Sequence, residues 1–303
     1  MRGRSLQTKL VILFVIVGLV PACLLSYVFI GQVRDLQRDE VIRISEETLQ
    51  EKKAALQALQ EHASRTAAQF ANDERRGMYW TVPLLETASP DSMTYRNTFT
   101  SLVDALTRMK TEIEYQYDDI VVAINGEVIY SDQNTLALES HDFITEAFAT
   151  GESRWSPWVY SPTYDQHYSY LLFPIFNLAD QTKVSGILGL GVSEERIQAI
   201  VQPDNDDVGR SAYLVDTAGL LYSNIYSGDS YQAINSTISS PVLEMIKQIQ
   251  GDTESEVLSS EYLNHDGRKV VSSLGIVPFS GTSLGLVVET DANTAFAQVR
   301  AGW

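Results

Sequence analysis

An uninterrupted apolar segment near the N-terminus constrains the folding of this chain more than any other feature. The segment extends from Leu10 to Gly31, has the sequence LVILFVIVGLVPACLLSYVFIG and contains no charged residue. As an α-helix it would extend about 33 Å, because each residue adds about 1.5 Å, and that length crosses the hydrocarbon core of a bilayer. We therefore predict a transmembrane helix over residues 10–31, which separates residues 1–9 from the rest of the chain.

The charges on either side of this segment predict its orientation. Arg2, Arg4 and Lys9 precede it, whereas the following stretch, QVRDLQRDE, nearly balances its charges. The positive-inside rule then places residues 1–9 in the cytoplasm and the bulk of the chain outside the inner (plasma) membrane. A cleaved signal peptide and a lipoprotein signal ending at Cys23 are the alternatives. The apolar run is too long for a typical signal peptide, and its continuation beyond Cys23 disfavours a lipoprotein signal.

Composition narrows the class of protein and of partner. The 303 residues allow one large or two small domains, and a hydrophobic content of 44% with 20% charged residues is typical of a folded chain. The formal net charge of −17 disfavours nucleic acid, which we exclude as a partner. A single cysteine excludes an intramolecular disulfide and a cysteine-based zinc site.

Residues 32–80 are predicted to form a long amphipathic helix. The stretch has no proline, no glycine before Gly77, and apolar or small residues at seven-residue steps: Ile42, Leu49, Leu56, Ala63 and Phe70. That period is typical of a helix that packs on its own domain and of a helix that pairs with a second copy. Ser45, Lys52 and Thr66 are poor residues for the alternate heptad position. We expect a homodimer through this helix, with packing on its own domain as the alternative.

The remaining chain contains two copies of one pattern. YDDIVVAINGEVIYSD (117–132) and SAYLVDTAGLLYSN (211–224) each predict two strands around a tight turn. Each pair precedes a short helix closed by a glycine, Gly151 or Gly251, and then three further strands. We predict an α+β fold with a five-stranded antiparallel sheet in each unit, and SEERIQAIV as a connecting helix.

Three stretches carry a family resemblance: ATGESRWSPWVYSPTYD followed by FPIF, then GILGLGVSEERIQAIV, then GIVPFSGTSLGLVVETDANTAFAQV. With the two predicted helices and the tandem units, residues 32–303 resemble the double-Cache sensor module. Such modules form the extracytoplasmic part of bacterial chemoreceptors, sensor histidine kinases and cyclic-dinucleotide enzymes. The resemblance implies PAS-like sheets, a ligand pocket in a membrane-distal unit over residues 81–202, and a membrane-proximal unit over residues 203–295.

The resemblance also implies an output domain in the cytoplasm that is not in this sequence. We expect residues 296–303 to begin the helix that leads to a second transmembrane segment. A methyl-accepting chemotaxis protein is the first expectation for the whole receptor, and the input domain of a histidine kinase or diguanylate cyclase is the alternative. A membrane-anchored binding protein that ends naturally at Trp303 and does not signal is a further alternative.

No supported catalytic motif is found, so we expect no enzymatic activity, no cofactor and no metal. The four histidines have no metal-ligand spacing among them, and DNDDVG (204–209) lacks the glutamate that closes a calcium loop. Asp118 and Asp119 are adjacent, so on a strand they would point to opposite faces and could not act as a catalytic pair. Binding of a small molecule is the function that remains.

Residues 154–170, RWSPWVYSPTYDQHYSY, concentrate aromatic side chains as the wall of a small-molecule site would. Alternation along one strand would place Trp158 and Tyr160 on the face opposite Trp155. We predict that the Trp158 face contacts the ligand and the Trp155 face packs; a sheet core or a dimer surface is the alternative. The candidate ligand-binding residues are Trp158, Tyr160, Tyr168, Tyr170, Tyr117, Asp119, Phe143 and Arg154.

The resemblance bears on the ligand as well. Amino-acid-binding members carry Arg-x-Trp-Tyr on the pocket helix, Tyr-x-Asp on the third strand and Asp late in the fifth. Here the helix region is SHDFITEAF, the third strand offers Tyr160-Ser161-Pro162, and the late position falls at about Gly191. We therefore do not expect a standard amino acid. Aromatic walls near an aspartate would suit an amine or a quaternary ammonium through cation–π contact, and the candidates are Asp119, Asp132, Asp142 and Asp165.

Overall fold

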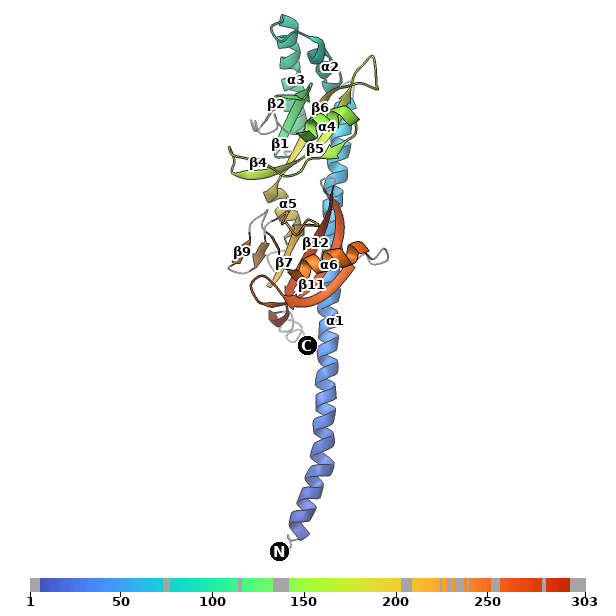
Figure 1. Ribbon diagram of the computed structural model, residues 1–303, viewed down its shortest axis with the longest axis vertical. Helices are drawn as coiled ribbons and strands as arrows, with labels where there is room; N and C mark the ends of the chain where they lie inside the picture. The colour runs from blue at the N-terminus through green and yellow to red at the C-terminus, as the bar shows by residue number, and fades with distance from the viewer. Residues whose placement is uncertain are drawn as a thin grey trace.

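The computed structural model describes residues 6–72, 77–113, 116–132, 142–202, 209–223, 225–227, 230–232, 237–238, 240–251, 257–279 and 282–294. The molecule is elongated, with one helix, α1, along most of its length and two sheet-containing units beside the upper part of that helix (Figure 1). The first unit in the sequence lies farther from the apolar end of α1, and the second lies nearer to it.

Helix α1, Leu6–Asn72, contains the whole apolar segment, with Pro21 inside it. Among the described helices it is the one long and apolar enough to cross a membrane; its most apolar window has a mean hydropathy of 2.6, and none of that window is buried. The helix ends at Asn72, short of the predicted residue 80. Helix α2, Met78–Thr87, begins after Gly77, whose φ of +95° lies in the left-handed region that favours glycine.

The seven-residue period of α1 is explained by packing on its own chain. Leu49, Leu56 and Ala63 are 0% exposed and Phe70 is 4% exposed, all within a core that reaches both sheets. Ser45, unfavourable for a coiled coil, is buried at 0% exposure, and its hydroxyl lies 3.0 Å from Oγ1 of Thr290. The seven-residue pattern between Ser45 and Phe70 is therefore explained by packing against the two sheets, without a second helix.

The first sheet is antiparallel and has the order β2-β1-β6-β5-β3, with β4 also paired to β5. Its strands are β1 (Asp119–Ile124), β2 (Glu127–Ser131), β3 (Arg154–Trp155), β4 (Val159–Ser161), β5 (Gln166–Phe176) and β6 (Val184–Ser193). Helices α1, α2 and α3 (Met93–Glu112) pack on one face, and α4 (Asp142–Thr150) packs on the other. Helix α5 (Glu194–Val201) leads to the second unit, as predicted.

The second sheet has the order β10-β11-β12-β7 and is also antiparallel. Its strands are β7 (Arg210–Val215), β10 (Val257–Leu263), β11 (Lys269–Phe279) and β12 (Thr282–Asp291), with α6 (Ser240–Gly251) on one face and α1 on the other. A separate hairpin pairs β8 (Ile225–Ser227) with β9 (Ser230–Gln232). The α+β class and the tandem sheets agree with the sequence, but over the described residues the sheets have six and four strands instead of five each.

The glycine turns behave as predicted. Asn125 and Gly126 have φ values of +53° and +84°, as the two-residue hairpin between β1 and β2 requires. Gly151, with φ of +65°, ends α4, and its N–H donates to the carbonyl of Ala147 at 3.1 Å. The expected strand after Gly219 is reduced to two isolated bridges, Leu221 with Val215 and Leu220 with Thr237, so it does not count as a fifth strand.

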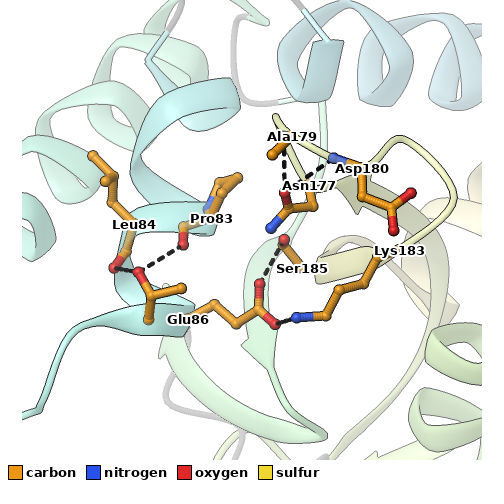
Figure 2. A network of polar contacts seen from close by, with 9 residues as sticks. Pro83, Leu84, Glu86, Asn177, Ala179, Asp180, Lys183 and Ser185 are labelled. Carbon is orange, nitrogen blue, oxygen red and sulfur yellow. Dashed lines mark hydrogen bonds and ion pairs between the residues drawn. The ribbon is translucent and has the colours of Figure 1, made fainter.

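A polar network fixes α2 to the far end of the first sheet. Glu86 of α2 accepts hydrogen bonds from Nζ of Lys183 and from Oγ of Ser185, the latter at 2.7 Å (Figure 2). Burial alone would raise the pKa of Glu86, but these hydrogen bonds and the charge of Lys183 lower it below its usual value. Gly186 allows the close approach, because a Cβ there would lie 2.5 Å from Cγ1 of Val82.

Candidate ligand-binding site

Strand alternation gives the first sheet a second buried face, beneath α4. Val121 and Ala123 of β1 and Tyr168 and Tyr170 of β5 lie in one buried cluster with Ile144 of α4. Val122, between the two β1 residues, and Leu171, next to Tyr170 on β5, belong instead to the core around α1. The face beneath α4 is thus a compact region of its own, lined by tyrosines as well as aliphatic side chains.

Asp119 brings a carboxylate into this apolar cluster. It begins β1 and alternates with Val121, so its side chain points to the α4 face, where it is 0% exposed. Its Oδ2 accepts a 2.9 Å hydrogen bond from the hydroxyl of Tyr170, and Oγ of Ser131 on β2 lies 3.3 Å from the same oxygen. Because a buried carboxylate is costly without donors, these hydroxyls stabilise it.

Gly191 of β6 is the cross-strand partner of both Asp119 and Tyr170. A Cβ at this position would lie 2.7 Å from Cε1 of Tyr170 and 3.1 Å from Cβ of Asp119. The ring of Tyr170 therefore lies over the glycine and reaches the carboxylate on the strand beyond. At the position where the resemblance expects an aspartate in amino-acid-binding relatives, this chain has a tyrosine ring, and the carboxylate lies one strand away.

Tyr168 adds a second phenol beside Tyr170, with ring centroids 6.2 Å apart. Its hydroxyl donates to Oε1 of Gln166 at 3.2 Å. Burial, together with the charges of Asp118 and Asp119, raises the pKa of Tyr168 to about 12. The hydroxyl of Tyr168 therefore stays protonated at neutral pH, and it can donate a hydrogen bond to a ligand.

Asp118 points away from the site, as its position next to Asp119 predicts. It pairs with Arg196 of α5, whose Nη2 lies 2.8 Å from Oδ1, and accepts hydrogen bonds of 2.8 Å from both N and Oγ of Ser193. Although burial raises the pKa of Asp118, these hydrogen bonds lower it below its usual value. The two adjacent aspartates thus have separate roles: one fixes α5 and the other faces α4.

Arg154 and Phe143 lie at the margin of the same site. Arg154 of β3 forms an ion pair with Glu146 of α4, with Nη1 and Oε1 2.7 Å apart. Phe143 of α4 is half-buried and packs against the cluster beneath the helix. Of the eight candidate residues, the structure therefore brings Asp119, Tyr168, Tyr170, Phe143 and Arg154 together around α4.

Trp158 and Tyr160 lie elsewhere. The indole N–H of Trp158 donates to the backbone carbonyl of Tyr222 in the second unit at 3.1 Å, and their ring centroids are 5.8 Å apart. Tyr160 is 46% exposed and donates to Oδ1 of Asp165 at 2.5 Å. The reason is that the chain is not one strand from residue 154 to residue 160: β3 ends before Pro157 and β4 begins after it, so alternation does not continue between them.

Trp155 and Tyr117 also make contacts outside the α4 face. Trp155 stacks on Phe279 of the second unit, with centroids 5.4 Å apart, in agreement with its predicted packing role. The hydroxyl of Tyr117 lies 2.9 Å from Nδ1 of His62 on α1. Burial raises the pKa of Tyr117. Both residues join the first unit to its surroundings and do not line the cluster beneath α4.

Ser131, Gln166 and Gly191 belong to the site but were not among the predicted site residues. Ser131 ends the IYSD stretch of β2, and its pairing with β1 could have suggested proximity to Asp119. The role of Gly191 depends on two non-adjacent strands, β1 and β5, that flank β6. Sequence spacing alone gives no signal for that arrangement.

Comparison with known proteins reveals the fold. No protein-family model and no curated protein matches the sequence. Among solved structures, the ligand-binding domain of the Campylobacter jejuni chemoreceptor Tlp3 in complex with L-valine is similar to 87% of this chain and 97% of its own, with a TM-score of 0.58 and 13% identity. The chain has the double-Cache fold.

Two further solved structures have a similar architecture. The sensory domain of Tlp3 determined as a separate crystal structure covers 87% of this chain and 98% of its own, with a TM-score of 0.57 and 14% identity. The extracellular domain assigned to the histidine kinase mmHK1S-Z3 covers 88% of this chain and 98% of its own, with a TM-score of 0.55 and 12% identity. These identities establish a shared architecture.

Proposed function

We propose that this chain is the extracytoplasmic ligand-sensing module of a bacterial transmembrane receptor, with its ligand bound beneath α4 of the membrane-distal unit. The observation that carries the proposal is the fully buried Asp119, held by Tyr170 and Ser131 in an otherwise apolar cluster. Buried charged groups are concentrated at functional sites, because their burial is costly. Sites for small molecules typically combine apolar walls with a few polar groups.

The chemistry of the site favours a ligand with an ammonium head. Asp119 offers carboxylate oxygens, and Tyr168 and Tyr170 offer aromatic faces and phenol oxygens, a set that suits a desolvated cation. The Tlp3 structures include complexes with L-valine and isoleucine. Because Tyr170 covers Gly191 here, we propose a small amine instead of a standard α-amino acid.

Signal would pass from the site through α1. The core around α1 includes residues of both sheets. Tyr117, just before β1, also forms a hydrogen bond with His62 of α1. A ligand that favours one arrangement of α4 and the first sheet would shift the balance between two positions of that sheet on α1. In this proposal the apolar part of α1 anchors the module in the inner membrane, with the sheets outside the cytoplasm.

We propose a chemoreceptor as the whole protein, with a histidine kinase or a diguanylate cyclase as the alternative output. A membrane-anchored binding protein without signalling is a second alternative from another class. Fusing residues 1–303 to a reporter output domain would separate signalling from binding alone, because a binding protein would change no output when ligand is added.

We also propose a homodimer through α1. Leu36 is 67% exposed on α1 between the apolar segment and the second unit. Farther along, Gln57, Gln60, Ser64 and Trp155 are among the residues that line an open surface groove of about 600 Å³. Leu36→Asp should shift the full chain from dimer to monomer in analytical ultracentrifugation. An unchanged sedimentation coefficient for this variant, or a monomeric parent, would exclude a dimer through this part of α1.

The ligand proposal is tested by thermal unfolding of the full chain in detergent micelles with a panel of small amines. A ligand at a hundred times its Kd stabilises the folded state by about 2.7 kcal/mol, which a thermal shift detects readily. Asp119→Asn should lose the shift, whereas Tyr160→Phe, with an exposed ring, should keep it. Equal shifts in the parent and in Asp119→Asn would exclude this site.

A further inference from the structure

The second sheet contains a buried carboxylate that the proposed sensing site does not use. Glu289 of β12 is 2% exposed, and the hydroxyls of Tyr213 and Tyr262 each donate to its Oε1 at 2.6 Å. Its other oxygen, Oε2, is inaccessible to solvent and has no hydrogen-bond partner in the protein. Oγ of Ser272, also buried, has none either. A buried polar atom without a hydrogen-bond partner destabilises the folded state by about 1–3 kcal/mol.

Glu289 occupies the place in the second unit that Gly191 occupies in the first. Oγ of Ser193 accepts from N of Arg196 where α5 begins, and Oδ1 of Asp291 accepts from N of Thr294 in the corresponding turn. Gly191 and Glu289 each lie two residues before these caps, on β6 and β12. The second unit therefore has a carboxylate, near the end of its β12 strand, where the first unit has a glycine.

The two unpartnered oxygens lie on the same face of the sheet. Ser272 of β11 is the direct cross-strand partner of Glu289, and partners in an antiparallel pair project to the same side. That side is the one covered by α6, because Tyr213 belongs to the cluster that α6 completes with Met245 and Ile246. The side chain of Ser272 also lies close to Tyr262 and lowers the pKa of that phenol, against the larger effects of burial and of Glu289.

Three basic groups around the second sheet lie on its opposite face, toward α1, where they interact with other residues. Arg38 and Lys269 both pair with Glu261 of β10, at 2.8 Å and 2.7 Å. Arg210 is the cross-strand partner of Thr290, on the face that packs on α1. Burial and the charge of Glu289 raise the pKa of Tyr213 and of Tyr262, so both phenols stay neutral. The only described donors to the carboxylate are therefore these two neutral hydroxyls, on one oxygen.

We propose that Glu289, Ser272, Tyr213 and Tyr262 form a second binding site, which takes an ammonium group: the free ammonium ion or the head of a small primary amine. An ammonium has three or four N–H donors, and this face offers Oε2 of Glu289, Oγ of Ser272 and the lone pairs of two phenols as acceptors. Its positive charge offsets the buried negative charge. A single carboxylate is too few ligands for calcium, which takes six to eight oxygens.

The site is separate from the one beneath α4, so it adds a second input nearer the membrane. The test measures thermal unfolding of the full chain in detergent micelles with ammonium, methylammonium, potassium or tetramethylammonium chloride at equal ionic strength. Ammonium should raise the unfolding midpoint, whereas potassium and tetramethylammonium, which lack N–H donors, should not. Stabilisation by methylammonium as well would identify amine heads as the source of the ligand, and stabilisation by ammonium alone would identify the free ion.

Variants separate this site from the sensing site. Glu289→Gln keeps the shape but removes the charge, and should abolish the ammonium shift; Ser272→Ala, a milder change, should weaken apparent ammonium affinity at least about tenfold. Asp119→Asn should retain the shift in full, so the two proposals fail independently. No shift in the parent, which would mean that water alone satisfies Glu289, overturns the proposal. So does an equal shift with potassium, or a shift that Ser272→Ala leaves unchanged.

Discussion

The indole N–H of Trp158 donates a 3.1 Å hydrogen bond to the backbone carbonyl of Tyr222, and this bond joins the first unit to the second. Beside it, Trp155 stacks on Phe279 of β11. Trp155 and Trp158, on either side of Pro157, therefore both contact the second unit and join it to the first. A displacement of the first sheet would be transmitted to the second through these aromatic contacts as well as through α1.

Trp158→Ala should destabilise the full chain by about 1–3 kcal/mol, because it removes a half-buried ring and leaves the Tyr222 carbonyl without its donor. Urea unfolding in detergent micelles measures the change. Trp158→Phe, which retains a ring, should cost less, and Tyr160→Phe should stay within about 0.5 kcal/mol because Tyr160 is exposed. If Trp158→Phe instead abolished ligand binding at unchanged stability, Trp158 would belong to the ligand site.

Tyr170→Phe should destabilise the chain by about 1–3 kcal/mol, because Asp119 would lose its 2.9 Å donor while staying buried. Tyr168→Phe is the matched control: its hydroxyl meets Gln166 at 3.2 Å, and its loss should cost less. Urea midpoints of both variants give the comparison. Equal midpoints for the two variants would mean that Asp119 does not depend on Tyr170.

The sequence predicted those features that local chemistry determines. The uncharged run from Leu10 to Gly31 lies within a helix, and Asn125-Gly126 forms the hairpin that its two positive φ values allow. The alternation of side chains along single strands was also predicted correctly. Asp118 and Asp119 point in opposite directions, and Tyr168 and Tyr170 lie on the same face. Each of these depends on residues adjacent in the chain.

The features that sequence reasoning missed depend on contacts between distant segments. A seven-residue period does not say whether Leu49 and Leu56 face a sheet or a second helix, and here they face the core shared with the sheets. Pro157 interrupts the strand that was expected to orient Trp158. The proximity of Asp119 to Tyr170 requires β6 to lie between β1 and β5, and strand order of this kind cannot be deduced from alternation.

Gly191→Ala should destabilise the chain by about 1–3 kcal/mol, because the new Cβ would lie 2.7 Å from the buried ring of Tyr170 and the ring would have to move. Gly189→Ala is the control on the same strand and face; its Cβ would lie 3.3 Å from that of Val121, a milder contact. The unfolding midpoint should fall further for Gly191→Ala, and ligand affinity should fall with it. An unchanged midpoint would show that the Tyr170 ring is not fixed over the glycine.

Asp118 should make the stability of the chain depend on acidity. Its folded-state pKa lies below its unfolded value of about 3.9, because hydrogen bonds from Arg196 and Ser193 outweigh burial. The contribution of this carboxylate is therefore fully present above that pH and is lost as the pH falls through the folded-state value. Asp118→Asn should be less stable than the parent by about 1–3 kcal/mol at pH 7.

The difference in urea midpoint between the parent and Asp118→Asn should shrink as the pH falls from about 4 through the folded-state pKa of Asp118, because below that pKa both folded chains have a neutral group at this position. Asp104→Asn, an exposed change on α3, should differ from the parent by less than about 0.5 kcal/mol at every pH. A difference for Asp118→Asn that stayed constant between pH 7 and pH 2 would mean that Asp118 fixes α5 by its shape and hydrogen bonds alone, without its charge.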